Sequence, residues 1–245
     1  MATTAVITMA GFGRRFADAG YSVPKYRIGV HGRSLFQWSM LSLRSFVQAG
    51  ASFVFVVRAA DAASDFIRDE AKSLGISDVG IVELSAPTDG QATTALAAQN
   101  AVSDRSSPML IYNIDTFVYP LAMTPAHARG DGWIPCFRAE GDAWSFAAAD
   151  GAGRVFEVRE KRRISPYATV GLYWFSSFAL YADAYQRYYA HAANIENGER
   201  YVAPIYNALI AERRAVYISL IEPRAVVPLG VPTDVERFRT APPPI

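Results

Sequence analysis

The stretch ITMAGFGRRF, residues 7–16, lies almost at the start of the chain and decides how the rest of it is interpreted. Its apolar run breaks into two glycines and then two arginines, which is typical of a first β-strand followed by a tight turn. Glycine-rich turns after a first strand often bring backbone N–H groups close to a phosphate. The residues around this turn therefore indicate which kind of phosphate it could bind.

Up to residue 115 the sequence alternates between short apolar strands and helices. Strands are predicted over 4–9, 52–58, 79–84 and 108–115, and helices over 33–50, 59–75 and 91–102. Such alternation is typical of a parallel sheet with helical crossovers. In the later part of the chain, strands joined by polar turns are predicted over 132–139, 143–150, 153–160 and 169–175. Two helices follow, over 177–191 and 202–213. We expect an α/β fold, a single Rossmann-like three-layer domain over residues 1–245 with a mixed, mainly parallel central sheet.

The composition is that of a packed globular protein. Hydrophobic residues make up 51% of the chain, charged residues 19%, and the formal net charge is +1. We therefore expect no nucleic-acid partner, and no membrane partner because no run approaches the ~20 apolar residues that cross a bilayer. The single cysteine, Cys136, excludes a disulfide framework within the chain, and the histidines are not spaced as metal ligands. No signal peptide is recognisable, so a cytoplasmic protein is expected.

Two common phosphate-binding motifs do not fit the opening stretch. A dinucleotide site needs a third glycine where this chain has Phe16. It also needs an acidic residue about 20 positions further on, and none lies between Asp18 and Asp61. A P-loop needs Lys-Ser or Lys-Thr at the start of the helix, and that pair is missing.

A longer combination of residues is more informative than the glycines alone. Gly11 and Gly13 allow backbone to approach an anion, Arg15 offers a planar fork of donors, and Lys25 after Pro24 adds a point charge. The simpler interpretation is a surface turn whose cationic side chains are only solvated. However, several cations on one loop repel one another unless an anion lies between them, so we favour a bound anion.

At this point the sequence resembles the sugar-1-phosphate nucleotidyltransferases, the nucleotide-sugar pyrophosphorylases that include glucose-1-phosphate thymidylyltransferase. The resemblance begins with Ala-Gly-x-Gly-x-Arg-Phe at 10–16 and Pro-Lys at 24–25. It continues in the family's order through PTDGQATTALAAQ (87–99), LIYNID (110–115), EVREKRRISPYATVGLYWF (157–175), NGERYVAPIYNALI (197–210) and LGVPTDVERF (229–238). The fold it implies is of the nucleotide-diphospho-sugar transferase type.

The resemblance implies that an oxygen of a phosphorylated acceptor attacks the α-phosphorus of an NTP and that pyrophosphate leaves. The implied catalytic residues are Arg15, which would hold the departing pyrophosphate, Lys25, which would bridge the α-phosphate and the attacking group, and Asp115, which would bind Mg²⁺. The implied nucleotide-binding residues are Ala10, Gly11, Gly13, Thr88, Gly90 and Gln91. The implied acceptor-binding residues are Glu160, Lys161, Gly171, Tyr173 and Glu199.

Each of these residues also has a simpler structural interpretation. Asp115 could be a turn aspartate, and Glu160 with Lys161 an exposed ion pair on a sheet edge. Gly171 and Tyr173 could be plain core, and Glu199 an acid favoured by the dipole at the start of a helix. Their joint occurrence in the family's order favours the functional interpretation.

The sequence departs from the family in two places. Many members carry Trp-x-Asp-x-Gly-Thr near the C-terminus, whose Asp is a second metal ligand, but Pro228 stands at that position here. Asp234 follows six residues later, at the expected start of a terminal helix, and is not assigned to the metal. The family's Lys-Pro pair is Lys161-Arg162 in this chain. These changes leave the acceptor open: a hexose phosphate, a heptose phosphate or a non-sugar such as phosphocholine.

Two other functions remain alternatives. A glycosyltransferase that uses a nucleotide sugar would need an Asp-x-Asp motif on a strand, but NID at 113–115 holds only one acid. A non-catalytic nucleotide-binding relative would fit the missing C-terminal Asp. Our expectation is an enzyme that activates a phosphorylated acceptor with an NTP for surface polysaccharide synthesis. The dense aromatic residues of 174–189 raise a homo-oligomer as a possibility, with core packing as the simpler interpretation.

Overall fold

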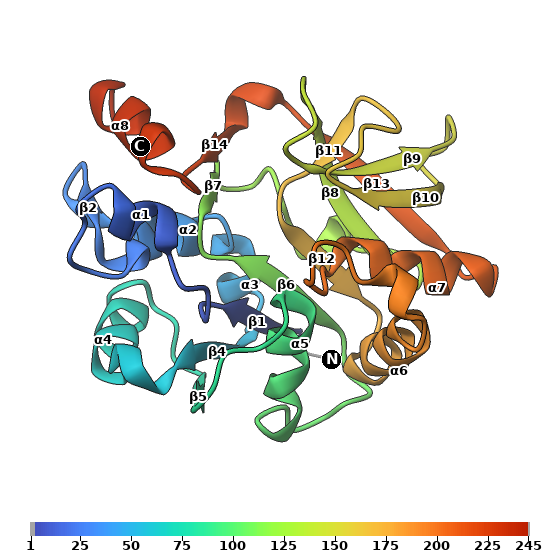
Figure 1. Cartoon of the computed structure of the whole chain (residues 1–245), viewed down its shortest axis with the longest axis horizontal. Helices are drawn as coiled ribbons and strands as arrows, with labels where there is room; N and C mark the ends of the chain where they lie inside the picture. Colours follow the sequence, from blue (N-terminus) through green and yellow to red (C-terminus); the bar gives the residue numbers. More distant parts are fainter. Residues whose placement is uncertain (1–2, 245) are drawn as a thin grey trace.

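The structure is a computed structural model that describes residues 3–244, so the first two residues and the last of the expected domain lie outside it. One ten-stranded sheet runs through it in the order β10-β9-β11-β8-β12-β6-β1-β4-β5, with β13 paired to β8 (Figure 1). Its strands are β1 (Thr4–Thr8), β4 (Ser52–Arg58), β5 (Val79–Leu84), β6 (Met109–Asn113), β8 (Gly132–Arg138), β9 (Ser145–Ala149), β10 (Val155–Glu160), β11 (Tyr167–Thr169), β12 (Leu172–Phe175) and β13 (Val216–Ile221).

The sheet changes character along the chain. Strands β6, β1, β4 and β5 pair in parallel, as the alternation of the first 115 residues predicts. Strand β12 then joins β6 antiparallel, and β8 to β11 continue the antiparallel half, in which only β13 pairs in parallel. The expected α/β fold with a mixed, mainly parallel central sheet and flanking helices is confirmed.

Helices cover both faces of this sheet and give it three layers. They are α1 (Arg14–Asp18), α2 (Leu35–Leu41), α3 (Arg44–Gln48), α4 (Ser64–Ser73), α5 (Gln91–Leu96), α6 (Phe178–Tyr189), α7 (Tyr206–Ala211) and α8 (Pro232–Thr240). Alternate residues of β1 enter two different cores: Ala5 and Ile7 pack with α2, α3 and α4, and Val6 packs with α5, α6 and α7. Such alternation follows from the two-residue period of a strand buried on both faces.

A third, smaller core joins the two ends of the chain. Phe16 of α1 and Trp38 of α2 pack with Phe238 of α8, and Trp38 donates its indole N–H to the Val30 carbonyl at 2.8 Å. Figure 1 shows α8 beside α1 and the short hairpin formed by β2 (Gly29–Val30) and β3 (Arg33–Ser34). The C-terminal helix therefore lies against the loop that begins with the opening glycines.

Several predicted boundaries were wrong. The helix predicted over 33–50 is two helices, α2 and α3, and it starts only after Ser34, whose hydroxyl accepts the Gln37 N–H at 3.1 Å. The strand predicted over 169–175 is divided into β11 and β12 by Gly171, whose φ is +84°. Strand β13 and the pair β7 (Thr116–Val118) and β14 (Val226–Pro228) were not predicted at all.

The aromatic residues of 174–189 are core rather than surface. Phe175, Phe178, Tyr181 and Tyr185 are buried in the second core, and Phe175 stacks on Tyr206 at 4.5 Å between ring centroids. This packing favours the simpler interpretation, core packing, and gives a homo-oligomer no support from that segment. No helix within residues 3–244 has the length and apolar character to cross a membrane.

Candidate active site

Two adjoining cavities lie where β1, β4 and β6 end. The first has a volume of about 580 Å³ and is lined by the glycine loop, the segment 87–91 and the residues that follow β6. The second has a volume of about 540 Å³ and is lined by residues of β9 to β12 and α8. In open α/β sheets ligands bind at the carboxyl ends of the strands, and these cavities lie at that edge of the sheet. The cavities share Arg15, Gln91, Asn113, Asp115 and Gly230.

Nearly all the residues singled out in the sequence line one cavity or both. The first cavity is lined by Ala10, Gly11, Gly13, Arg15, Lys25, Thr88, Gly90, Gln91, Asp115 and Glu199. The second is lined by Arg15, Gln91, Asp115, Glu160, Gly171 and Tyr173. Glu199, expected beside the acceptor, thus lies on the glycine-loop side. Lys161 lines neither cavity: its ammonium donates to the Tyr201 hydroxyl at 3.0 Å and lies 4.9 Å from the centre of that ring.

The glycine loop ends in a short helix that positions Arg15. Gly13 precedes α1 with a φ of +62°, and its carbonyl accepts the N–H of Phe16 at 2.9 Å and of Ala17 at 3.1 Å. The Phe16 side chain is buried in the third core, which anchors the helix. Arg15, one residue earlier, therefore lies between the two cavities rather than in solvent alone.

An ion pair joins the glycine-loop region to the strand that ends at the site. The Lys25 ammonium lies 2.6 Å from Oδ2 of Asp115, and both side chains are about a quarter exposed, at 22% and 27%. The turn after β6 is fixed because the Tyr112 hydroxyl donates to the Thr116 carbonyl at 2.8 Å and Leu229 N–H donates to the Asp115 carbonyl at 2.9 Å. The carboxylate of Asp115 therefore has a defined place at the junction of the cavities.

The segment 87–91 is held from behind by a residue far along the chain. Arg200 N–H donates to the Asp89 carbonyl at 2.7 Å, and the Arg200 carbonyl accepts the Ala92 N–H at 3.0 Å. Gly90 has a φ of +141°, and a Cβ there would lie 2.5 Å from the Arg200 backbone. The guanidinium of Arg200 also pairs with Asp89 at 3.1 Å and donates to the Tyr185 hydroxyl at 2.7 Å. Only a glycine at position 90 allows this approach.

A chain of polar side chains lines the junction of the cavities. The Gln91 amide donates to the Thr8 hydroxyl at 3.1 Å and to the Asn113 side-chain carbonyl. Asn113 in turn lies against Gly171, where any Cβ would clash with the Asn113 amide. Gln91 and Gly171, singled out for different ligands in the sequence, are therefore linked through Asn113, which the sequence analysis missed.

The second cavity holds a carboxylate in a desolvated position. Glu160, at the end of β10, accepts a hydrogen bond from the Ser145 hydroxyl. Burial raises the pKa of Glu160, while the Ser145 hydrogen bond and the Lys161 charge lower it by less. The nearby Tyr173 hydroxyl shares a 3.0 Å hydrogen bond with Thr169, and burial raises its pKa above the usual range of tyrosine. Tyr173 thus remains a neutral donor or acceptor at physiological pH.

Helix α8 forms a wall of the second cavity that sequence reasoning did not anticipate. Val231, Asp234 and Arg237 recur every third residue and face the cavity, and the carboxylate of Asp234 lies 3.9 Å from the guanidinium of Arg237. Pro228, which replaces the family's second acid, also lines this cavity. The three-residue spacing was visible in the sequence, but nothing in it indicated which face of the helix would meet the site.

Comparison with known proteins identifies the family. No family model and no curated protein matches the sequence. The crystal structure of the nucleoside-diphosphate-sugar pyrophosphorylase from Vibrio cholerae RC9 does match, with 36% identity and a TM-score of 0.90 over 97% of this chain and 100% of that one. The fold and this match define a nucleotidyltransferase. The chain belongs to the nucleoside-diphosphate-sugar pyrophosphorylase family.

Two more distant structures share the fold. The inositol-1-phosphate CTP transferase from T. maritima matches with a TM-score of 0.75 and 16% identity, over 96% of this chain and 92% of that one. A protein from Bacillus anthracis assigned as a glucose-1-phosphate thymidylyltransferase, in complex with sucrose, matches with the same score and identity over 97% and 94%. At this level of identity the likeness extends to the fold alone.

Proposed function

We propose that this enzyme transfers NMP from an NTP to a sugar 1-phosphate, giving an NDP-sugar and pyrophosphate. The observation that carries the proposal is that two cavities of ligand size meet at Arg15 and Asp115. Nucleotidyl transfer needs two polyanions held side by side with their charges neutralised between them. A cation and a carboxylate at the shared boundary suit that task.

In this mechanism the first cavity binds the NTP. The base lies against Thr88, Gly90 and Gln91, and the triphosphate follows the glycine loop between Gly11 and Gly13. Arg15 lines both cavities, so its guanidinium can contact phosphate oxygens of both substrates. Lys25, which lines the first cavity beside Asp115, would give its charge to the α-phosphate.

The residues present fit a Mg²⁺ ion that arrives with the nucleotide. Within residues 3–244 no group of three or more His, Cys, Asp or Glu side chains is arranged to hold a metal. Mg²⁺ is commonly bound by one or two carboxylates together with substrate phosphates, so a single protein carboxylate is sufficient. Asp115 would be that ligand, and the ion would neutralise developing phosphate charge.

The acceptor would lie in the second cavity with its hydroxyls at Glu160 and Tyr173. As described, Lys161 is engaged with Tyr201, so Arg15 is the better placed cation for the acceptor phosphate. We propose a sugar phosphate used for surface polysaccharide synthesis in the cytoplasm. The lining carboxylates would also accept hydrogen bonds from an amino or ammonium group, so phosphorylated amino alcohols belong in the test.

The test is a pyrophosphate-release assay. The purified protein is incubated with Mg²⁺, each of the common NTPs and a panel of hexose, heptose and amino-alcohol phosphates. We expect release with one NTP and acceptor pair, with an NDP-linked product of matching mass. Nucleotide binding without release on any acceptor would contradict the proposal and favour a non-catalytic relative.

A further inference from the structure

Two groups of residues line the first cavity without lining the second. One is the segment 87–90 with Gly198 and Glu199, which we assign to the base. The other is Phe12, Arg14 and Arg58, which lie together because each guanidinium is 5.2 Å from the centre of the Phe12 ring. The second group is cationic and belongs to neither the base nor the acceptor side.

Arg58 is placed by the sheet beside the glycine loop. It is the last residue of β4, which pairs in parallel with β1 so that Thr8 lies opposite Val56. The Met9 N–H continues this pairing with a 2.8 Å hydrogen bond to the Val56 carbonyl. Two residues beyond Val56, Arg58 therefore stands next to the backbone from which the loop of Gly11 and Gly13 begins.

The guanidinium of Arg58 is held rigidly on one edge. Its Nε donates to Asp61 Oδ2 at 3.2 Å and its Nη2 to Asp61 Oδ1 at 2.5 Å, and the Asp61 side chain is only 6% exposed. The remaining N–H groups of Arg58, including both on Nη1, have no hydrogen-bond partner among residues 3–244. A guanidinium fixed by a carboxylate on one edge presents its other edge to phosphate at little entropic cost.

The geometry of an in-line displacement indicates which phosphates the free edge of the Arg58 guanidinium would contact. The acceptor oxygen forms its bond to the α-phosphorus from the side of the second cavity. The bond from the α-phosphorus to the bridging oxygen then breaks, and pyrophosphate leaves with the electron pair on the opposite side. A cation that lines the first cavity alone, away from the residues shared with the second, is positioned for that leaving group.

We infer that Arg58, held by Asp61, binds the β- and γ-phosphates of the NTP and the departing pyrophosphate. The inference rests on the proposed function and assigns a further binding residue to it. Arg58 takes up no proton in the step and supplies only fixed positive charge. This role also accounts for the half-exposed Phe12 between the two loop glycines, since its ring contacts Arg58 and so ties the loop to β4. The glycines themselves supply no such contact, because a Cβ on either one would have no neighbour within 4 Å.

A neighbouring hydroxyl supports an anion at this place. Tyr26 lines the same cavity, is 2% exposed, and its hydroxyl has no hydrogen-bond partner among the described residues. Burial first and the charge of Asp61 second raise the pKa of Tyr26 to about 12, so the hydroxyl keeps its proton. It would be a second donor close to the Arg58 and Asp61 pair.

The test compares ligands with and without the β- and γ-phosphates. Binding of inorganic pyrophosphate, of the NTP that the wild-type enzyme turns over and of its NMP is measured by calorimetry for wild type, Arg58→Ala and Arg58→Lys. We expect Arg58→Ala to weaken pyrophosphate and NTP at least tenfold and NMP by less than twofold. Arg58→Lys keeps the charge but loses the fork, so it should recover only part of the affinity.

A matched control is Arg129→Ala. Arg129 also lies over an aromatic ring, 4.1 Å from the centre of Tyr217, but it lines neither cavity and should leave all three affinities unchanged. Unchanged pyrophosphate affinity in a folded Arg58→Ala variant would overturn the inference, and so would an equal loss for NMP. If Arg58→Ala does not fold, Arg58→Lys with wild-type pyrophosphate affinity would overturn it. Failure of the wild-type enzyme to release pyrophosphate with any acceptor would instead count against the proposed function.

Discussion

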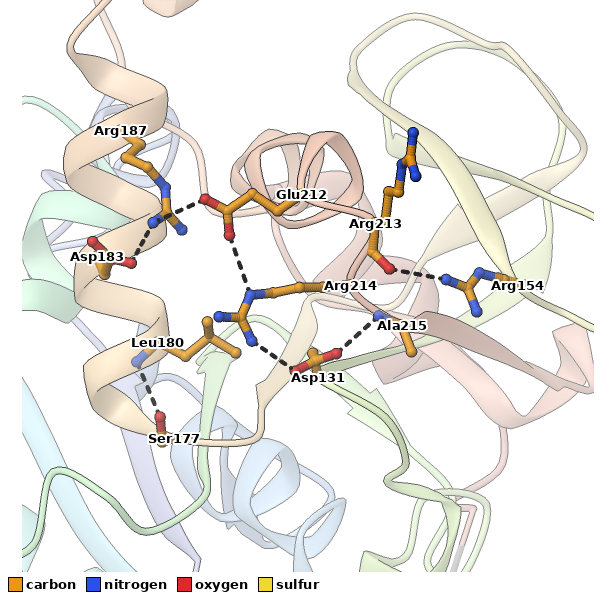
Figure 2. A network of polar contacts seen from close by, with 10 residues as sticks. All are labelled: Asp131, Arg154, Ser177, Leu180, Asp183, Arg187, Glu212, Arg213, Arg214 and Ala215. Carbon is orange, nitrogen blue, oxygen red and sulfur yellow. Dashed lines mark hydrogen bonds and ion pairs between the residues drawn. The ribbon is translucent and has the colours of Figure 1, made fainter.

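Two sets of ion pairs in this molecule are arranged in different ways. Figure 2 shows the first, in which Arg214 pairs with Asp131 at 3.1 Å and with Glu212 at 3.2 Å, and Glu212 continues to Arg187 at 3.0 Å. The last ion pair joins Arg187 to Asp183 of α6, so the network ties α6, the end of α7 and the start of β8 together. Each of these five charges has a partner of the opposite sign, whereas Arg154, also drawn in Figure 2, donates to the Arg213 carbonyl.

The charges around the cavities are not matched in that way. Lys25 and Asp115 form one isolated pair, and Arg14 and Arg15 have no ion-pair partner among residues 3–244. Because the charges of Arg214, Asp131, Glu212, Arg187 and Asp183 are paired with one another, we expect that network to serve the fold, whereas Arg14 and Arg15 at the cavities are left for a ligand. Substitutions in the two sets should therefore separate activity from stability.

The largest effect is expected for Asp115→Asn. The amide is nearly isosteric but carries no charge, so it binds Mg²⁺ poorly and no longer pairs with Lys25. We expect kcat/KM for pyrophosphate release to fall about 100- to 1,000-fold, with the melting temperature close to that of wild type. An enzyme that keeps more than half of its activity would show that Asp115 belongs with the structural charges.

Arg15→Ala should follow, with a loss of about 100-fold in kcat/KM, because its charge-assisted hydrogen bonds to phosphate would be removed. Arg14→Ala is the informative neighbour, since Arg14 lines only the first cavity and packs on Phe12. We expect a smaller loss there, expressed in the KM for the NTP. Equal losses for the two variants would contradict the separate role of Arg15 at the boundary of the cavities.

Glu160→Gln should lower activity about 10- to 100-fold, because a hydrogen bond from an acceptor hydroxyl to a charged group would be weakened. The same substitution should not lower the stability of the folded protein at neutral pH. Burial raises the pKa of Glu160, so the folded protein binds this proton more tightly than the unfolded chain does, and stability falls as the pH rises through the raised pKa.

Thermal unfolding of the Glu160→Gln variant from pH 4 to 7 measures that sign. The variant should be at least as stable as wild type at pH 7, and the advantage should disappear below the ordinary pKa of glutamate. A variant that is less stable than wild type at pH 7 would mean that the ionised carboxylate supports the fold, as the network of Figure 2 does.

The features of the site that the sequence could predict are local ones. The strand-turn pattern around Gly11 and Gly13 and the apolar run ending at Asp115 are local, so their positions at the sheet's carboxyl edge follow from the alternation of strands and helices. Contacts across long separations are not local. Arg200 lies over Gly90, and α8 beside Arg15, only because separate elements pack together.

Two residues lie in places that the sequence did not predict, Lys161 and Glu199. Lys161 follows Glu160 directly, yet its φ of +46° turns its side chain toward Tyr201 rather than into the cavity. Glu199 was expected at the acceptor, but the tight turn of Asn197 and Gly198, both with positive φ, presents it to the first cavity. Neither backbone conformation could be derived from residue types alone, because the surrounding packing selects it.

The smallest effect on activity is expected for Arg214→Ala, which opens the network of Figure 2 at its centre. The Arg214 side chain is 40% exposed, and pairs of this kind contribute about 0.2–1 kcal/mol each, less at high salt. We expect the free energy of unfolding to fall by about 1 kcal/mol in low salt, measured by urea denaturation, and kcat/KM to stay within twofold of wild type. Asp131 would keep the Ala215 N–H as a partner at 2.8 Å, so β8 and β13 should remain paired. A loss of activity larger than the loss of stability explains would show that α6 and α7 transmit strain to the cavities, and the two sets of charges would then not be independent.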